Sequence, residues 1–444
     1  MNKSVAELQA MFNQTKNEYS YNPNIPTEER IQGAIMGAII GDALGVGCHW
    51  IYDYEELWRD YGPWITDYTD PKATNDGGSF EMISAYRYGA GVRAGMSSQS
   101  GQLLQVLLET VAGNCHKSEQ EGQFNQEEYV RDVNHFFEHV LLPEAAFESD
   151  IDIYNSHKGV KLEHGTYFGS DAGIKCFSGR YTNEEVRLNF DLWFNKGAKN
   201  GRWWAPESNV ALTSTSEGAQ WGVVLAALYR DPRELFYKAW DFLNLWYVDK
   251  AFITTQIVYI MTVHAMINNI PIEQYENYFI ALFDKINETN KLISSFDDLM
   301  LFTTTYRMAK RDYLMEMKDL RFAPIFFGQD CHASNLIRCS YYYALKFAND
   351  FETGILTAVN SSGNNMARAA LTGGLLGAMV GIKGIPQRFI DGLINDPALI
   401  PAGYASQGAY LLDLVKTVAA KTTGTIPEIE LAYESDCGCY INLD

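Results

Sequence analysis

The chain has 444 residues, of which 47% are hydrophobic, and a formal net charge of −20 at pH 7. This length and apolar content predict a soluble globular protein with a large core. The acidic balance argues against nucleic acid as a partner and against binding to anionic membranes. We expect a cytoplasmic protein, because the seven scattered cysteines are typical of reduced thiols and no N-terminal stretch has the order of an export signal.

Residues 1–27 are polar and predict an N-terminal arm outside the core. A helix is predicted over 31–45, where a glycine recurs at every fourth position. These glycines are Gly33, Gly37, Gly41 and Gly45. A four-residue step keeps residues on one helix face. Because the side chains on this face are so small, another backbone can approach it closely. Because glycine costs up to about 1 kcal/mol against alanine inside a helix, the pattern predicts a compensating helix contact.

A carboxylate and an aromatic pair stand at the end of this helix. The carboxylate of Asp42 is costly to bury unless it is paired or bound to something. Its role is therefore structural, as a cap or a buried hydrogen-bonding group facing the opposite glycine helix, or it is a site residue. His49 and Trp50 follow it closely. A histidine beside an aromatic ring is either a packed core residue or a catalytic group.

Helices are predicted in the middle of the chain at 101–111, 127–142, 234–248, 250–268, 273–289 and 296–316. The run 251–266 is apolar almost all round, which predicts a buried central helix. By contrast, 145–220 is rich in glycine, asparagine, serine and aromatic residues. An irregular segment of this length inside a domain predicts a lid-like insertion.

Three motifs in this middle part each have two interpretations. His135 and His139 match an H-x-x-E-H zinc pattern on one helix face, but no third ligand is identifiable, so a solvated face is favoured. Trp203 and Trp204 either stack on an adenine or anchor a local side core. The glycine-containing segment before Asp171 is a weak phosphate-loop pattern, because no strand and helix flank it.

A second glycine pattern lies near the other end of the chain, in a helix predicted over 369–381. Its small residues are Ala369, Gly373, Gly377 and Gly381. The matched patterns predict that the two helices pack against each other or against a shared neighbour. No repeat or linker divides 28–425, so one domain is expected. Residues 426–444 form a tail in which Cys437 and Cys439 are too close for the usual zinc hook.

The His49-Trp50 pair after the first glycine helix, and the Asn365-x-Ala367-Arg368 before the second, resemble the ADP-ribosylglycohydrolase superfamily. Within it they are most similar to the branch of the J1 crystallins. The resemblance covers roughly 28–113 and 331–395. It implies an all-α fold, a single compact multi-helix orthogonal domain, whose two ends meet at one site. It also implies cleavage of a glycosidic bond between ADP-ribose and a side chain.

Enzymes of this superfamily, as the resemblance implies, hold two magnesium ions with two acidic motifs ahead of helices. Aligning the second motif on Gly363 puts Asn364 and Met366 where its aspartates stand, and Ala367 where its threonine or serine stands. An amide can still donate one neutral oxygen, but a thioether is a poor magnesium ligand.

The first motif has two possible registers. Thr74-Asn75-Asp76 keeps one of two acids, whereas Ser100-Gly101-Gln102 keeps none but runs directly into a helix. We prefer the second register for that reason. Either register predicts that no full magnesium pair forms, so no metal ligand and no cofactor are assigned, although magnesium is expected for the family.

Three hypotheses of function follow. The first is a hydrolase acting on an ADP-ribosyl or other nucleotide or ribosyl glycosidic substrate, with Asp42 and Asp76 as catalytic acid or base. The others are an inactive ADP-ribose-binding protein and a J1-crystallin-like structural protein. An enzyme should bring further carboxylates to the cleft, such as Glu109, Asp171 or Glu217.

The predicted partner is a small molecule or an ADP-ribosylated protein, and the oligomeric state stays open. The residues expected to bind substrate come from both ends of the chain and from the irregular segment. They are His49, Trp50, Ser100, Gly101, Gln102, Asp171, Gly363, Asn364, Asn365 and Arg368. The loops 42–53, 97–102 and 360–366 should therefore meet at one cleft.

Overall fold

The fold is α-helical, as the sequence predicts. The computed structural model describes residues 22–73, 84, 87–88, 92–113, 124–135, 214–247, 249–290, 300–310, 319–394, 403–422, 424 and 426. Within these ranges the regular structure consists of α-helices and short 3-10 turns, and no strand is present.

In chain order, the helices are α2 (Thr27–Val46), α3 (Tyr54–Tyr61), α5 (Gln99–Ala112), α6 (Gln126–His135), α9 (Glu217–Leu228), α10 (Pro232–Leu243), α11 (Lys250–Ile267), α12 (Tyr275–Asn290), α13 (Met300–Lys310), α15 (Ala323–Phe327), α16 (Ala333–Lys346), α17 (Phe351–Val359), α18 (Asn365–Val380), α19 (Gln387–Asp391) and α20 (Gln407–Lys421). Three 3-10 turns accompany them: η5 (Ile272–Gln274), η7 (Leu320–Phe322) and η8 (Ile382–Gly384).

The two glycine helices, α2 and α18, pack directly against each other. A Cβ atom added to Gly37 would overlap the backbone carbonyl of Gly373, and one added to Gly373 would overlap that of Gly37. Gly33 and Gly377 show the same reciprocal overlap. The two backbones are therefore in contact along the stripes, which confirms the prediction that the matched glycines mark a shared interface.

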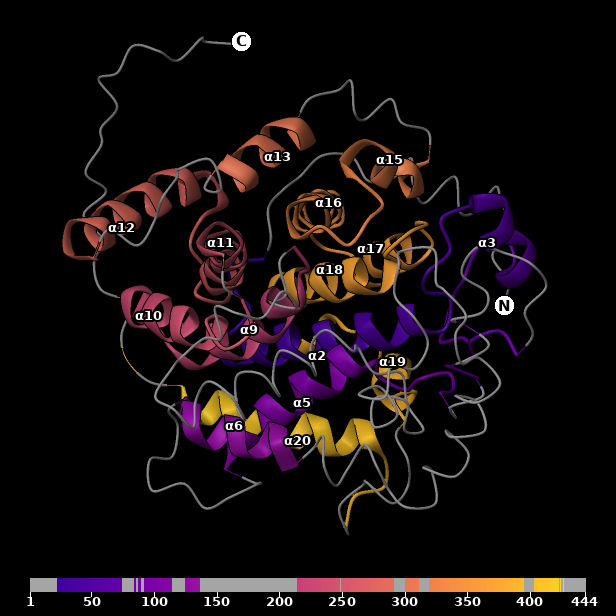
Figure 1. The fold of residues 1–444 in the computed structure, drawn as a ribbon, viewed down its shortest axis with the longest axis horizontal. Helices are drawn as coiled ribbons and strands as arrows, with labels where there is room; N and C mark the ends of the chain where they lie inside the picture. The colour runs from indigo at the N-terminus through magenta and orange to yellow at the C-terminus, as the bar shows by residue number, and fades with distance from the viewer. Residues whose placement is uncertain are drawn as a thin grey trace.

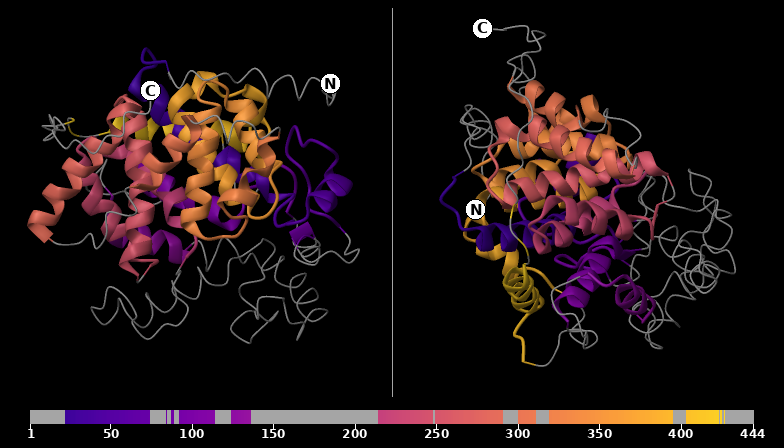
Figure 2. Two further views of the ribbon diagram at one scale, coloured as in Figure 1. Left: turned by 90° about the horizontal axis from the view of Figure 1, so that it is seen from above. Right: turned by 90° about the vertical axis from the view of Figure 1, so that its left-hand side faces the viewer.

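This helix pair forms the centre of the molecule (Figure 1). Helices α16 and α17 pack on α18, while α5 and α20 pack on α2. Helices α9 and α11 contact both members of the pair. Figure 2 shows from two further directions that the indigo N-terminal part lies against the orange helices of the later part of the chain. Two segments from opposite ends of the sequence thus share one core.

Helix α11 confirms the prediction of a buried central helix. It is the one helix in the described part of the chain that is long and apolar enough to cross a membrane by composition, and 83% of it is buried inside the protein. Its Tyr259 hydroxyl donates a 2.7 Å hydrogen bond to the carbonyl of Leu371 on α18. Burial all round explains why no polar face is present.

The other predicted helices lie close to observed ones where the structure describes them. The prediction over 127–142 matches α6 as far as His135, whereas His139 lies outside the described residues. Most of the irregular segment, including Trp203 and Trp204, and the cysteine tail also lie outside them.

A buried asparagine fastens the segment after α3 to the end of α17. The Asn360 amide oxygen accepts from the Ile65 backbone nitrogen at 2.7 Å, and its amide nitrogen donates to the Ile65 carbonyl at 2.8 Å. Only 1% of Asn360 is exposed. Loss of this side chain therefore leaves a buried backbone donor and acceptor without their partner.

We expect Asn360→Ala to lower the free energy of unfolding by about 2 kcal/mol, because each unpaired buried group carries a desolvation penalty of this order. The measurement is urea unfolding followed by circular dichroism. Asn24→Ala, at an exposed asparagine, is the control and should change stability by less than about 0.5 kcal/mol. Equal effects of the two changes would contradict the assigned role.

Candidate functional site

Three segments from distant parts of the sequence meet at one place, which we call the junction: residues 42–53, 97–102 and 360–368. The Gly363 backbone nitrogen donates to the Ile51 carbonyl at 2.6 Å. The Asn365 amide contacts the Cys48 sulfur at 3.0 Å. The Ser98 backbone nitrogen donates to Asp42 at 2.7 Å. The structure therefore brings together the segments that the sequence predicts to form the site.

Asp42 is fully buried and hydrogen-bonded by two elements. The Ser98 hydroxyl donates to its Oδ1 at 2.6 Å, the Ser98 backbone nitrogen donates to its Oδ2, and the Gln220 amide on α9 donates to Oδ1 at 3.2 Å. Burial raises the pKa of Asp42, and the Ser98 and Gln220 hydrogen bonds and the charge of Arg87 partly offset this rise. Asp42 thus links α2 to α5 and α9.

This finding corrects one expectation. As a buried hydrogen-bonding group, Asp42 was expected to face the opposite glycine helix, but its partners lie on the Ser98 cap of α5 and on α9. The reason is steric. The helix face toward α18 is occupied by glycine, with the backbone of Ala369 against Gly41, so the neighbouring carboxylate points to the other side.

His49 is influenced by the charges of two buried guanidinium groups, Arg87 and Arg368. Arg87, itself fully buried, donates to the His49 backbone carbonyl. Burial first, and then the charges of Arg87 and Arg368, lower the pKa of His49 well below its usual range, so the imidazole is neutral at physiological pH. The ring stacks on the half-buried Trp50, with centroids 5.0 Å apart.

The turn before α18 is shaped by a glycine and closed by an asparagine. Gly363 has φ +77°, and a Cβ there would overlap the Gln329 carbonyl, so both conformation and space require glycine. Asn364 is the N-cap, and its side chain accepts from the Ala367 backbone nitrogen at 3.3 Å. The Asn365 amide also donates to the Val359 carbonyl at 2.9 Å.

The first turn of α5 carries the predicted residues Ser100, Gly101 and Gln102. A Cβ on Gly101 would overlap the Asp42 carboxylate, so this glycine permits the carboxylate to reach the Ser98 cap. The Ser100 carbonyl accepts from the Trp221 indole at 2.8 Å. The Gln102 amide nitrogen lies 3.4 Å from the Ser97 carbonyl.

Several buried polar atoms at the junction lack a hydrogen-bond partner among the described residues. They are Gln102 Oε1, Arg368 Nε and Arg368 Nη2. His49 and Asn365 also carry buried polar atoms here, and these two side chains interact with each other. Buried polar groups in native proteins are nearly always paired with protein, water or a ligand. A cluster of open donors and acceptors therefore marks this place as one where a polar ligand fits.

The side chains at the second metal motif do not fit a magnesium pair. Met366 packs with Val46 and Val92 in a small apolar cluster, and the oxygen of Asn364 caps its own helix. Magnesium binds through oxygen ligands, carboxylates above all. In the described ranges, moreover, no group of three or more histidine, cysteine, aspartate or glutamate side chains is placed to hold a metal ion.

Two predicted site residues lie outside the described residues. They are Asp76, with the rest of the alternative first-motif register, and Asp171. Of the further carboxylates, Glu109 accepts from the Tyr410 hydroxyl at 2.9 Å. Glu217 begins α9, where its charge raises the pKa of the buried Tyr247, second to burial.

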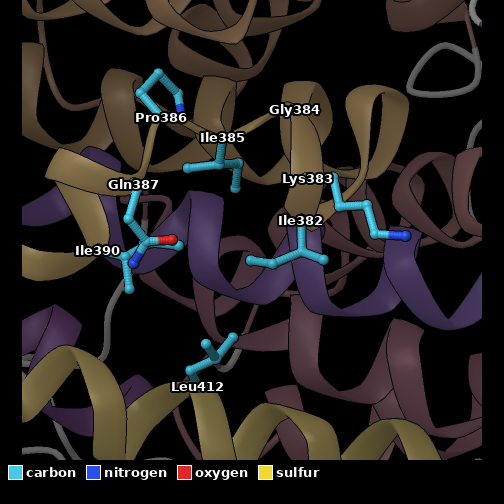
Figure 3. Close-up of a pocket in the computed structure, with 8 residues that line it drawn as sticks. All are labelled: Ile382, Lys383, Gly384, Ile385, Pro386, Gln387, Ile390 and Leu412. Atoms are coloured by element: carbon cyan, nitrogen blue, oxygen red, sulfur yellow. The ribbon is translucent and has the colours of Figure 1, made fainter.

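A separate pocket of about 480 Å³ lies between η8, the start of α19, and α20. Figure 3 shows Ile382 and Leu412 on opposite sides of this hollow. Its polar side chains are engaged elsewhere: Lys383 pairs with Glu29 at 2.6 Å, and Gln387 donates to Asp391 at 2.9 Å. None of the predicted site residues lines this pocket.

Sequence reasoning missed three residues that build the junction: Arg87, Ser98 and Gln220. Ser98 had a detectable signal, because a serine directly before a helix is a typical N-cap, and its hydroxyl accepts from the Gly101 backbone nitrogen. Arg87 and Gln220 carry no local pattern. Only the tertiary fold brings them to Asp42 and His49.

The comparisons with known proteins agree with the fold. The family model described as ADP-ribosylglycohydrolase matches residues 23–424. A solved structure titled "ADP-ribosylglycohydrolase-related protein complex" is similar in fold, with a TM-score of 0.50 and 13% identity over 89% of this chain and 99% of that chain. No curated protein matches the chain. The family match spans both glycine helices and all three segments of the junction, so the chain belongs to the ADP-ribosylglycohydrolase family.

Proposed function

We propose that this protein binds an ADP-ribosyl or another nucleotide-like ribosyl ligand at the junction, without a magnesium pair. One observation carries the proposal: segments from both ends of the chain bring open, buried polar atoms to the junction, on Gln102 and Arg368, and the junction also holds the His49 and Asn365 side chains. Membership of the ADP-ribosylglycohydrolase family supports the ligand class. The guanidinium, imidazole and amide groups suit the hydroxyl and phosphoryl groups of such a ligand.

A second candidate function is hydrolysis of the ligand's glycosidic bond. It is favoured by the raised pKa of Asp42, because a carboxyl group that keeps its proton nearer neutral pH can act as a general acid on a leaving group. Asp76 would be the second carboxylate. Hydrolysis would then proceed without two-metal chemistry, on a small molecule or an ADP-ribosylated protein.

Calorimetric titration with ADP-ribose tests binding. We expect saturable binding whose Kd changes by less than about twofold between excess magnesium and excess EDTA, because the amide and thioether groups at Asn364 and Met366 attract the ion weakly. A Kd that rises at least about tenfold in EDTA would support the family's metal-dependent site instead. Absence of binding in both conditions would favour the structural, J1-crystallin-like alternative.

Chromatography of the products from an ADP-ribosylated peptide then separates the two functions. Release of free ADP-ribose supports hydrolysis, and binding without release supports a silent binder. Asp42→Ala and Asp42→Asn serve as controls for this assay.

A further inference from the structure

Arg368 is a buried cation, and only two of its five N–H groups have partners among the described residues. It lies in the first turns of α18 and has 0% of its surface exposed. Its Nη1 donates to the Ser362 carbonyl at 3.0 Å and to the Ser361 carbonyl at 3.4 Å. Its Nε and Nη2 have no partner among the described residues. A buried charge is costly when it is left without partners.

Arg30 provides an internal comparison at the other end of the same helix pair. It is equally buried, yet all three of its guanidinium nitrogens donate to carbonyls. Nη1 reaches Ala378 at 2.8 Å, Nε reaches Ile25 at 3.3 Å, and Nη2 reaches Asn22 at 2.5 Å. This fold can therefore satisfy a buried guanidinium with its own backbone. The open edge of Arg368 is a local feature of the junction.

The charge of Arg368 is not neutralised by an ion pair in the described part of the chain. Five groups whose pKa is affected by its charge are neutral at physiological pH. They are His49, Tyr52, Tyr54, Cys339 and Tyr343. Asp42, the buried carboxylate of the junction, accepts from Ser98 and Gln220, and the arginine charge that affects its pKa is that of Arg87. Arg368 thus has no ion-pair partner among the described residues, and the carboxylate of Asp330 acts on the same Tyr52 hydroxyl as Arg368 does without forming an ion pair with it.

We propose that the Nε–Nη2 edge of Arg368 is an anion subsite that takes a phosphoryl group. Nε and Nη2 share one edge of the planar guanidinium, and their parallel N–H groups match two oxygens of one phosphoryl group. The subsite deepens the proposed function and rests on it for the identity of the ligand, whose phosphoryl group it binds. Because Arg368 is fully buried, a neighbouring side chain moves when the anion enters.

The test compares Arg368→Lys, which keeps the positive charge but loses the two parallel N–H groups, with Arg30→Lys as a matched buried control. The full chain is titrated in EDTA with ADP-ribose, inorganic pyrophosphate and adenosine. We expect Arg368→Lys to weaken ADP-ribose and pyrophosphate at least about tenfold, because a hydrogen bond to a charged group contributes that much to affinity. Adenosine, which has no phosphoryl group, should bind equally to both proteins. Arg30→Lys should lower Tm but leave every Kd unchanged.

The outcomes separate the subsite from the proposed function. Arg368-dependent binding of pyrophosphate without binding of ADP-ribose supports the subsite and overturns the proposed ligand. If Arg368→Lys leaves the binding of ADP-ribose unchanged, the subsite is overturned and the proposed function is kept. In that case a buried water pairs with the open N–H groups of Arg368. Absence of binding of both compounds to the wild-type chain overturns both.

A second measurement covers a variant that folds poorly. Pyrophosphate should raise the Tm of the wild-type protein above that in sodium chloride of equal ionic strength. Equal Tm values in the two salts would contradict the subsite.

Discussion

Gly37→Ala is expected to destabilise the protein by about 3 kcal/mol or more, a large effect for one methyl group. The added Cβ would overlap the backbone carbonyl of Gly373. A carbonyl inside a helix cannot rotate away, so α2 and α18 must separate and lose contacts along the whole stripe. The gain in helix propensity, up to about 1 kcal/mol for alanine over glycine, is too small to offset this loss.

Chemical unfolding of Gly37→Ala and Gly373→Ala measures the effect, and the two should agree because the overlap is reciprocal. Gly62→Ala is the control. Nothing lies within 4 Å of a Cβ at Gly62. Its φ of 83° and ψ of 176° are nearly exclusive to glycine, so only a backbone penalty of about 1–3 kcal/mol applies. If Gly37→Ala proves no more destabilising than Gly62→Ala, the backbone contact between α2 and α18 does not hold the core together.

The central helix pair could be predicted from the sequence because of its two glycine patterns. A glycine at every fourth position has no benefit for an isolated helix, so its presence in two helices indicates a close contact between backbones. The partner of each stripe could not be derived from spacing alone, since a shared neighbour would satisfy the pattern equally. The reciprocal overlap of Gly33 with Gly377 settles that alternative in favour of direct packing.

The junction was less predictable than the fold. Proximity of its three segments followed from the family resemblance, whereas the hydrogen bonds of Asp42 to Ser98 and Gln220 depend on how α5 and α9 pack on α2. Such contacts leave no periodic signal in the sequence. The open edge of Arg368 is likewise a property of tertiary geometry, because an arginine near a helix start is usually solvated.

Asp42→Ala should lower the free energy of unfolding by about 3 kcal/mol, because it leaves the Ser98 backbone nitrogen and the Gln220 amide as buried donors without an acceptor. Asp42→Asn should change it far less. An asparagine can accept from the Ser98 backbone nitrogen and donate to the Ser98 hydroxyl and, after Gln220 turns its amide, to the Gln220 oxygen. The pair thus separates loss of a side chain from loss of a charge.

The two variants also decide the catalytic role of Asp42. Asp42→Asn keeps the packing but cannot transfer a proton. If Asp42 is a general acid, this variant folds normally and releases ADP-ribose at least about 100-fold more slowly than the wild type. Release at the wild-type rate by a folded Asp42→Asn protein would leave Asp42 with a structural role only.

The pH dependence of stability provides an independent check on Asp42. Its pKa in the folded protein is raised above the usual 3.8, mainly by burial, so the folded state keeps this proton after the unfolded chain has lost it. The contribution of the protonated group is complete below pH 3.8 and declines as pH rises through the folded pKa.

We therefore expect the free energy of unfolding of Asp42→Asn, measured relative to wild type, to increase with pH across that window and then stay level. Urea unfolding of both proteins from pH 4 to pH 8 measures the difference. A difference that is constant over this range, or that falls with pH, would show that the hydrogen bonds from Ser98 and Gln220 outweigh burial and keep Asp42 ionised.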